Sequence, residues 1–248
     1  MQTVDALFTP AEFTLLPQRD LSRTVCVVFD VLRATSSIVT ALANGATAVI
    51  PVAEIPDALA VRRRSANVLL AGERDGLRIG PDLAEGVSFD FGNSPREFTP
   101  DRVRDRTIVT TTTNGTRALR ACAHAQTVLV GSFLNLSATV QHLQTARAES
   151  LLLVCGGTFE RAAYEDVLCA GAVLERLVIN EMTDAALLAL TAFRIAANDL
   201  LAALQQAENG RRLNARPELA EDVPFCATID RFGVGAALDR DGTIRRIR

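Results

Sequence analysis

The chain has 248 residues, of which 48% are hydrophobic and 22% are charged, and its net charge is −3. A chain of this length can bury a substantial hydrophobic core, and the negative charge excludes the basic surface typical of a nucleic-acid-binding protein. The five cysteines have irregular spacing and form no C-x-x-C pair: Cys26, Cys122, Cys155, Cys169 and Cys226. This spacing argues against a disulfide framework and a structural zinc site, so most of these thiols are expected to be buried and inert.

The longest apolar runs, such as residues 151–155 and 185–190, are far shorter than the ~20 residues that a membrane-spanning helix needs. The first five residues, Met1 to Asp5, lack the basic start and the apolar segment of a secretion signal. We therefore expect a cytoplasmic protein with no membrane partner.

Residues 1–23 are predicted to be irregular and to pair with the body of the protein at an edge, with Pro10 and Pro17 interrupting them. A continuous apolar run over 25–29 then predicts a strand that is buried on both faces of a parallel sheet. Asp30 follows this strand, and the segment up to Ser37 turns into a helix over 38–44. A second strand is predicted over 48–52, which completes one βαβ unit.

The alternation of helices and strands continues along the chain. Helices are predicted over residues 55–65, 117–125, 137–145, 165–179 and 185–206, and strands over residues 68–71, from 108 onward, 127–131 and 151–155. A short segment starts at residue 217, and an Asp-Gly turn predicts a final hairpin of 234–238 and 243–247. This alternation is typical of an α/β fold with a mostly parallel sheet covered by helices. We expect a single domain over 1–248.

Two further features concern the organisation of the chain. Residues 28–52 overlay residues 107–131 without a gap, which suggests an internal duplication of βαβ units, although the identities are few and two unrelated units also fit them. Residues 75–100 contain four glycines and three prolines and form a long loop. A loop of this length inside a compact domain is usually functional.

The strand that starts at Ile108 runs into a polar turn, Thr111-Thr112-Thr113-Asn114-Gly115-Thr116. Asn-Gly favours a sharp turn, and Thr116 can cap the helix that follows. Hydroxyls and free amides would then meet at a helix N-terminus, which can bind a phosphate or sulfonate. The alternative is an ordinary connection between a threonine-rich strand and a helix.

Acidic residues follow three of the predicted strands: Asp30, Glu73 and, beyond Gly156-Gly157, the pair Glu165-Asp166. Ligands of open α/β sheets bind beyond the carboxyl ends of the strands. Mg²⁺ is held there by one or two carboxylates together with phosphate oxygens and water. Asp30, Glu73 and Asp166 are therefore the candidate Mg²⁺ ligands, and the alternative for each is a helix cap or an ion pair with a neighbouring arginine.

Two other classes of function fit parts of the sequence. Cys155 and Arg161 have the C-x5-R spacing of cysteine-dependent phosphatases, but Glu160 would place a negative charge in a loop that must bind a dianion. A non-catalytic anion- or nucleotide-binding module would use the threonine-rich turn without a metal. Because neither His124 nor His142 is well placed, an enzyme would need a metal-bound water or an aspartate as its nucleophile or base.

Several of these stretches resemble the 2-phosphosulfolactate phosphatase family. The resemblance rests on six motifs and a weaker echo near residue 222: Asp30-Val31-Leu32-Arg33-Ala34-Thr35-Ser36, Gly72-Glu73-Arg74, Phe91-Gly92-Asn93-Ser94-Pro95, Thr111 to Thr116, Gly131-Ser132-Phe133-Leu134-Asn135, Glu165-Asp166, and Asp222-Val223-Pro224. It implies a three-layer α/β/α fold and Mg²⁺-dependent hydrolysis of 2-phospho-3-sulfolactate, a reaction that serves coenzyme M synthesis in methanogens.

Together, the resemblance and the strand ends predict the residues of the site. The predicted catalytic residues are Asp30, Arg33, Glu73 and Asp166, and the predicted substrate-binding residues are Thr35, Ser36, Arg74, Asn93, Thr112, Thr113, Asn114, Gly115 and Thr116. Arg33 and Arg74 are expected to grip the carboxylate or sulfonate of a small anionic phosphorylated substrate, because a guanidinium can hold two oxygens at once. A homodimer is a further expectation.

Overall fold

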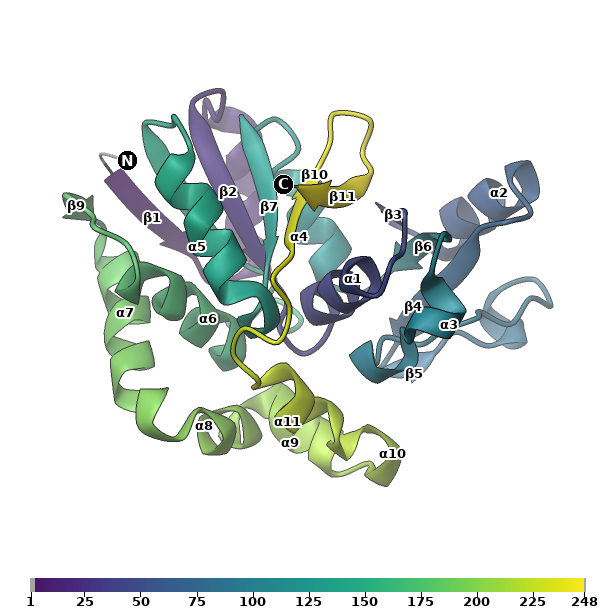
Figure 1. Cartoon of the computed structure of the whole chain (residues 1–248). Helices are drawn as coiled ribbons and strands as arrows, with labels where there is room; N and C mark the ends of the chain where they lie inside the picture. The colour runs from purple at the N-terminus through teal and green to yellow at the C-terminus, as the bar shows by residue number, and fades with distance from the viewer. Residues whose placement is uncertain (1–2, 248) are drawn as a thin grey trace.

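One mixed sheet runs through residues 3–247, the part of the chain that the computed structural model describes (Figure 1). Within this part the strand order is β5-β4-β6-β3-β11-β10-β7-β2-β8-β1-β9. The strands are β1 (Thr3–Leu7), β2 (Thr24–Phe29), β3 (Ala48–Pro51), β4 (Leu69–Arg74), β5 (Leu77–Arg78), β6 (Thr107–Thr111), β7 (Thr127–Gly131), β8 (Ser150–Cys155), β9 (Glu181–Met182), β10 (Gly235–Leu238) and β11 (Ile244–Ile247).

Helices cover both faces of the sheet, which confirms the predicted three-layer α/β/α fold. The α-helices are α1 (Ala34–Ala43), α2 (Ile55–Arg64), α3 (Pro100–Val103), α4 (Gly115–Ala121), α5 (Leu136–Thr145), α6 (Tyr164–Glu175), α7 (Asp184–Ala196), α8 (Leu200–Gln206), α9 (Glu208–Asn214), α10 (Pro217–Ala220) and α11 (Asp222–Cys226). Short 3-10 helices lie at Pro10–Gln18, Pro81–Leu83, Pro95–Glu97, Phe133–Asn135 and Ala197–Asp199.

The central strand β2 is buried on both faces, as its apolar run predicts. Side chains alternate along a strand, so Val25, Val27 and Phe29 pack in one core with α5 and α6. The intervening Cys26 and Val28 pack in a second core with α1 and α4. The end of β2 is therefore fixed between two helical layers, and the residue that follows it is Asp30.

The C-terminal hairpin of β10 and β11 lies in the middle of the sheet, where it separates two groups of parallel strands. Its contacts with β7 and with β3 are both antiparallel. The two predicted βαβ units are β2-α1-β3 and β6-α4-β7. They exchange strands on either side of the hairpin: β2 of the first unit pairs with β7 of the second, and β3 of the first pairs with β6 of the second. This exchange has the symmetry that an internal duplication would produce, and the duplication itself stays a prediction.

The N-terminal segment is more regular than the sequence predicts. Residues 3–7 form β1, which pairs in parallel with both β8 and β9, and residues 10–18 form a 3-10 helix. Met1 and Gln2 lie outside the described residues. Pairing with β8, which is far along the chain, supplies the hydrogen bonds that make this segment a strand, and a local pattern cannot reveal such a partner.

Helix α1 begins at Ala34, earlier than the predicted residue 38, because Asp30 caps it. The Asp30 Oδ1 accepts the Ala34 N–H at 3.2 Å, and the Asp30 carbonyl accepts the Thr35 N–H at 2.9 Å. This capping brings Asp30 and the helix N-terminus together at the end of β2.

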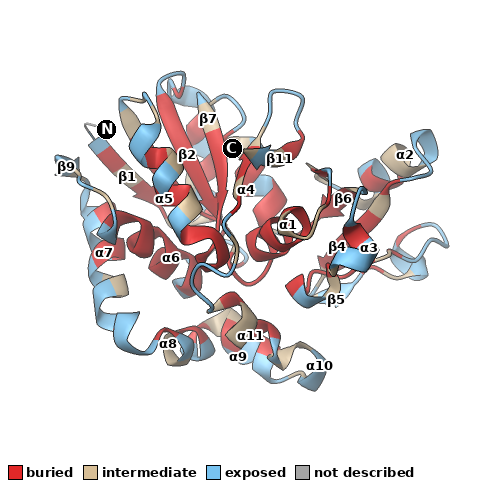
Figure 2. Ribbon diagram, in the orientation of Figure 1, coloured by how far each residue is buried: buried red, intermediate tan, exposed pale blue. Residues whose placement is uncertain are grey.

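The predicted helix over 185–206 is interrupted. Asp199 accepts the Ala202 N–H at 3.0 Å and starts α8, so α7 and α8 are joined by a 3-10 turn. By length and composition, Asp184–Gln206 is the one helical stretch of residues 3–247 that could cross a membrane. Its inner side packs on α6, where Gly171 lies against the Ala189 backbone, and its outer side is exposed (Figure 2).

Candidate functional site

A pocket of about 290 Å³ lies where the ends of β2, β4, β6 and β8 meet the C-terminal helices α9 and α10. The strand ends contribute Asp30, Leu32, Arg33, Glu73, Asp75, Gly76, Thr113, Asn114, Gly157, Thr158 and Phe159, and the loop before Pro95 contributes Asn93. The C-terminal helices contribute Asn209, Arg212, Leu213, Ala215, Arg216 and Leu219. The strand ends that the sequence singled out therefore do converge on one cavity.

Asp30 is half-buried at the floor of this pocket. Burial is the main reason that the pKa of its carboxyl group is raised from 3.8 to about 7. The negative charges of Glu73 and Glu165 raise this pKa further, whereas hydrogen bonds from the backbone of Ala34 and Gly115 lower it. Its own N–H donates to the Thr35 hydroxyl at 3.1 Å. Asp30 is therefore held in one orientation beside other acidic groups.

Glu73, in β4, is a buried carboxylate on the same pocket. Its Oε1 accepts hydrogen bonds from the Thr113 N–H and the Thr113 hydroxyl, both at 3.0 Å. Its Oε2 accepts the Gly76 N–H at 2.7 Å. Three donors thus fix both oxygens, and only Oε2 keeps a lone pair for a further partner.

Asp166 lies beneath the pocket and outside its lining. Its two oxygens accept the Val31 N–H at 2.8 Å and the Gly157 N–H at 3.1 Å, so it ties the end of β2 to the turn after β8. Burial raises the pKa of Asp166 well above its usual range, and the charges of Glu165 and Asp30 raise it further. Asp166 therefore holds these two segments together, and its role as a metal ligand stays a prediction.

The neighbouring Glu165 was named with Asp166 in the sequence but was not among the candidate Mg²⁺ ligands. Its Oε1 accepts a hydrogen bond from Asn209 at 2.6 Å, whereas its Oε2 is buried and has no hydrogen-bond partner among the described residues. Burial raises the pKa of Glu165, and the hydrogen bond from Asn209 opposes this shift. Glu165 and Asp30 lie close enough to Asp166 for their charges to raise its pKa, and Glu165 also raises the pKa of Asp30.

The threonine-rich turn binds protein carboxylates in this structure. Thr113 donates to Glu73, and the Asn114 side chain donates to the Gly157 carbonyl at 2.9 Å. Gly115 lies so close to Asp30 that a Cβ atom built on it would be 2.8 Å from the Asp30 Oδ2. Thr112 and Thr116 are buried and bonded to each other, outside the pocket lining. The turn therefore orients Asp30 and Glu73, and of its predicted substrate-binding residues only Thr113 and Asn114 line the pocket.

Three other predicted substrate-binding residues also lie outside the pocket lining. Thr35 and Ser36 are fully buried, with the Ser36 hydroxyl donating to the Val31 carbonyl at 2.8 Å. Arg74 turns back toward its own strand, where it donates to the Glu73 carbonyl at 2.7 Å and to the Thr111 hydroxyl at 3.2 Å. Asn93 lines the pocket and accepts the Ser37 hydroxyl on its carbonyl at 2.7 Å.

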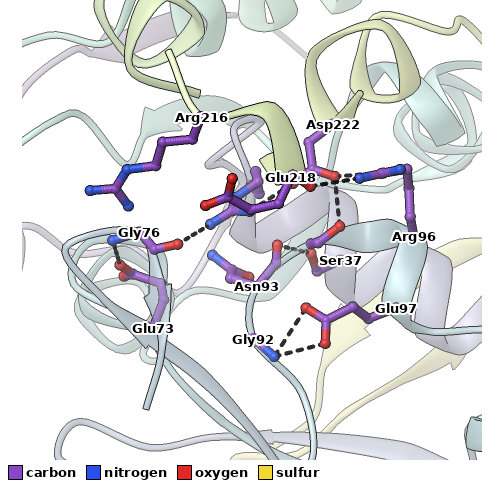
Figure 3. Close-up of polar contacts among 12 residues, drawn as sticks. Ser37, Glu73, Gly76, Gly92, Asn93, Arg96, Glu97, Arg216, Glu218 and Asp222 are labelled. Carbon is purple, nitrogen blue, oxygen red and sulfur yellow. Dashed lines mark hydrogen bonds and ion pairs between the residues drawn. The ribbon is translucent and has the colours of Figure 1, made fainter. Parts of the chain in front are cut away.

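Arg33 lines the pocket, and its charge is paired with the buried Asp222 of α11. The Arg33 Nη1 lies 2.6 Å from the Asp222 Oδ2, and its Nη2 donates to the Gly76 carbonyl at 2.8 Å. The other Asp222 oxygen accepts from Ser94 at 2.6 Å. It also accepts from Arg96 at 2.9 Å (Figure 3). This network attaches the C-terminal helices to the strand ends, and three of its residues lie in the motifs that the sequence offered: Arg33, Ser94 and Asp222.

Known proteins are similar to this chain over most of its length. The sequence pattern of the family described as 2-phosphosulpholactate phosphatase matches residues 11–239. The chain belongs to the 2-phosphosulfolactate phosphatase family. A probable 2-phosphosulfolactate phosphatase of Caldanaerobacter subterraneus subsp. tengcongensis is 37% identical over 246 residues, covering 96% of this chain and 97% of the relative. Proteins with the same description from Thermotoga petrophila and Pseudothermotoga lettingae are 42% and 36% identical, covering 83% and 98% of this chain and 85% and 99% of the relatives.

In this member of the 2-phosphosulfolactate phosphatase family, the cysteine alternative has no structural support. Cys155 is fully buried in β8, and burial raises the pKa of its thiol well above the usual range. Arg161 lies outside the pocket lining and pairs with Glu208 at 2.7 Å. A neutral, buried thiol cannot attack a phosphate, so the C-x5-R spacing is coincidental.

The acidic residues that line this pocket fit a divalent cation. Asp30 and Glu73 bring two carboxylates to one pocket, and the unpartnered oxygen of Glu165 adds negative potential below them. Among residues 3–247, no three His, Cys, Asp or Glu side chains form a cluster that could hold a metal. Two carboxylates completed by water and substrate phosphate are the usual environment of Mg²⁺, which seldom has an all-protein cage.

Proposed function

We propose that this protein is a phosphoric monoester hydrolase that converts 2-phosphosulfolactate into sulfolactate and inorganic phosphate with the help of Mg²⁺. Membership of the family supports the reaction and the substrate. The observation that supports the metal requirement is the juxtaposition of Asp30 and Glu73 in a pocket that Arg212 and Arg216 also line. This layout suits a bound cation at the floor and an anionic substrate above it.

Asp30 and Glu73 would hold the Mg²⁺ ion in this site. When bound, the ion supplies positive charge that neutralises phosphate oxygens and lowers the pKa of bound water. The protein orients the two carboxylates: backbone donors of Ala34 and Gly115 fix Asp30, and Thr113 and Gly76 fix Glu73. Asp166 holds the chain on both sides of Asp30 through Val31 and Gly157.

The test is the release of phosphate from 2-phosphosulfolactate by protein that has been treated with EDTA. We expect no turnover after chelation, recovery with Mg²⁺, and a loss of turnover in Asp30→Asn and Glu73→Gln. Cys155→Ala serves as the matched control, because this buried residue lies outside the pocket. Full activity of the chelated protein, together with an inactive Cys155→Ala, would overturn the proposal.

The same variants distinguish the proposed enzyme from a non-catalytic anion-binding module. If the protein is a binding module, the Glu73→Gln variant still binds the anionic ligand, and even the wild-type protein releases no phosphate. Equilibrium binding of 2-phosphosulfolactate, measured beside phosphate release, therefore decides between the two classes.

A further inference from the structure

Two arginines on the C-terminal helical segment line the pocket opposite the acidic floor. Arg212 lies in α9, and Arg216 lies between α9 and α10. Within residues 3–247, neither forms an ion pair with a carboxylate, whereas the other pocket arginine, Arg33, is paired with the buried Asp222, which it shares with Arg96. The pocket therefore has positive charge available on this wall.

Neutral groups hold the two guanidinium groups at the mouth of the pocket. Arg212 lies over the ring of Phe159, with its Cζ 5.4 Å from the ring centroid, and its Nη1 is 3.4 Å from the Asn209 Oδ1. Arg216 donates to the Asp75 carbonyl at 3.1 Å. None of these contacts neutralises the charge, and the five N–H donors of each guanidinium leave room for an anionic partner.

Arg216 is also connected to the acidic floor through a single turn. Its Nη1 lies 3.5 Å from the position that a Cβ atom of Gly76 would take, and the Gly76 N–H binds the Glu73 carboxylate at 2.7 Å (Figure 3). The pocket thus changes from negative to positive between Glu73 and Arg216. We call Arg212 and Arg216 the arginine wall. The binding free energy of a substrate with several acidic groups is most favourable when its phosphate lies at a metal beside Asp30 and Glu73 and its other acidic groups lie at the arginine wall.

We propose that Arg212 and Arg216 bind the acidic groups of the substrate other than its phosphate, and so set the specificity of this enzyme for phosphate esters of acidic compounds. The inference rests on the proposed function. It replaces the expectation that Arg33 and Arg74 do this, because both terminal nitrogens of Arg33 are engaged by Asp222 and the Gly76 carbonyl and Arg74 lies outside the pocket lining. Planar guanidinium groups suit both carboxylates and sulfonates, which they bind through paired hydrogen bonds.

The first experiment compares three phosphate esters that share the reacting group. These are 2-phosphosulfolactate with a carboxylate and a sulfonate, 2-phospholactate with the carboxylate alone, and isopropyl phosphate with neither. For Arg212→Ala and Arg216→Ala we expect kcat/KM for phosphosulfolactate to fall about tenfold to a hundredfold, the range for a hydrogen bond to a charged group. The fall for isopropyl phosphate should be less than about threefold, since the ester has no group for these residues to bind.

Arg211→Ala is the matched control. Arg211 belongs to the same helix, is exposed, donates to the Gln206 carbonyl and does not line the pocket. Its removal changes the net charge as much as the test variants do, so it should leave all three values of kcat/KM unaltered. If Arg212→Ala and Arg216→Ala lower kcat/KM equally for all three esters, the arginines do not recognise the acidic groups and the proposal is wrong.

A second readout does not depend on turnover. Sulfolactate has the carboxylate and sulfonate but no phosphate, and its binding to metal-free protein can be measured by calorimetry. We expect wild type and Arg211→Ala to bind it, and Arg212→Ala with Arg216→Ala to bind it at least about tenfold more weakly. Equal binding by wild type and the double variant, or no binding by either, overturns the assignment. Arginine-dependent binding without phosphate release would instead overturn the proposed hydrolysis and leave the arginine assignment standing.

Discussion

The Thr113 residue gives both its backbone N–H and its hydroxyl to one oxygen of Glu73, each at 3.0 Å. A carboxylate that must hold a metal is usually oriented in this way by neighbouring donors. Thr113→Val keeps the shape of the side chain and the backbone donor but removes the hydroxyl. We expect the Mg²⁺ concentration for half-maximal activity to rise about tenfold or more, the lower end of the effect of such supporting groups.

The matched control for this variant is Thr191→Val, because Thr191 is exposed on α7 and its hydroxyl donates to the Leu187 carbonyl. It should leave the Mg²⁺ requirement unchanged. An unchanged requirement in Thr113→Val as well would show that the hydroxyl does not support metal binding.

Gly115 leaves the space that Asp30 occupies. A Cβ atom at this position would be 2.7 Å from the Ala34 Cβ and 2.8 Å from the Asp30 Oδ2, so Gly115→Ala must displace the carboxylate or the helix that it caps. Overpacking of this kind costs about 1–3 kcal/mol of stability, and we expect phosphatase activity to be lost while the protein still folds. Gly233→Ala is the control, because a Cβ atom there meets nothing within 4 Å. Normal activity in Gly115→Ala would show that the position of Asp30 is not critical.

The ion pair of Arg33 and Asp222 is buried at both ends. Asp222→Ala would leave the Arg33 charge without a partner, and we expect the free energy of unfolding to fall by about 3–5 kcal/mol, the usual cost of breaking a buried pair. Glu175→Ala, which breaks the exposed pair with Arg194, should cost at most about 1 kcal/mol. Urea unfolding of the three proteins measures the difference, and equal losses in the two variants would contradict the structural role of Asp222.

The pH dependence of stability follows from Asp30. The pKa of this carboxyl group is about 7 in the folded protein and close to its ordinary value of 3.8 in the unfolded chain. Between these values the folded state binds a proton that the unfolded state has released, so the stability of the metal-free protein should fall as the pH rises from about 4 to 7. Burial raises the pKa of Asp166 as well and acts in the same direction.

Urea unfolding at pH 5 and pH 8 checks this dependence. Asp30→Asn should reduce the difference between the two pH values. Asp241→Asn should not, because hydrogen bonds to Arg245 and Thr243 lower the pKa of Asp241 to about 2, outside this range. Mg²⁺ should stabilise the wild type more at pH 8 than at pH 5, since a metal and a proton compete for the same carboxylate. A wild type whose stability rises from pH 5 to pH 8 without metal would contradict the raised pKa of Asp30.

The sequence predicted the strands of the core well because burial on both faces leaves a clear pattern. The run that became β2 is apolar throughout, and the acidic residues after β2 and in β4 meet at one pocket, as the rule for strand ends predicts. The role of Thr113 could not be predicted, because its partner Glu73 is 40 residues away and their contact depends on β4 lying beside β6.

The arginine wall left no distinct signal in the sequence. Arg211, Arg212 and Arg216 lie within six residues of one another, and a helical segment with several arginines is usually a solvated surface. Only the packing of α9 and α10 over the strand ends separates the two pocket residues from the third. The position of the final hairpin in the sheet could not be predicted either. Its Asp-Gly turn predicts the two strands, but not that β10 pairs with β7 and β11 with β3.

That hairpin has a consequence for synthesis on the ribosome. Residues 235–247 emerge after all the other strands, yet they occupy the centre of the sheet between β3 and β7. Until they arrive, β3 and β7 are open edges with unpaired backbone groups, and open edges can pair with other chains. The nascent protein must therefore keep two half-sheets apart from foreign partners until its final strands join them, and its yield in the cell should depend on chaperones more than its final stability implies.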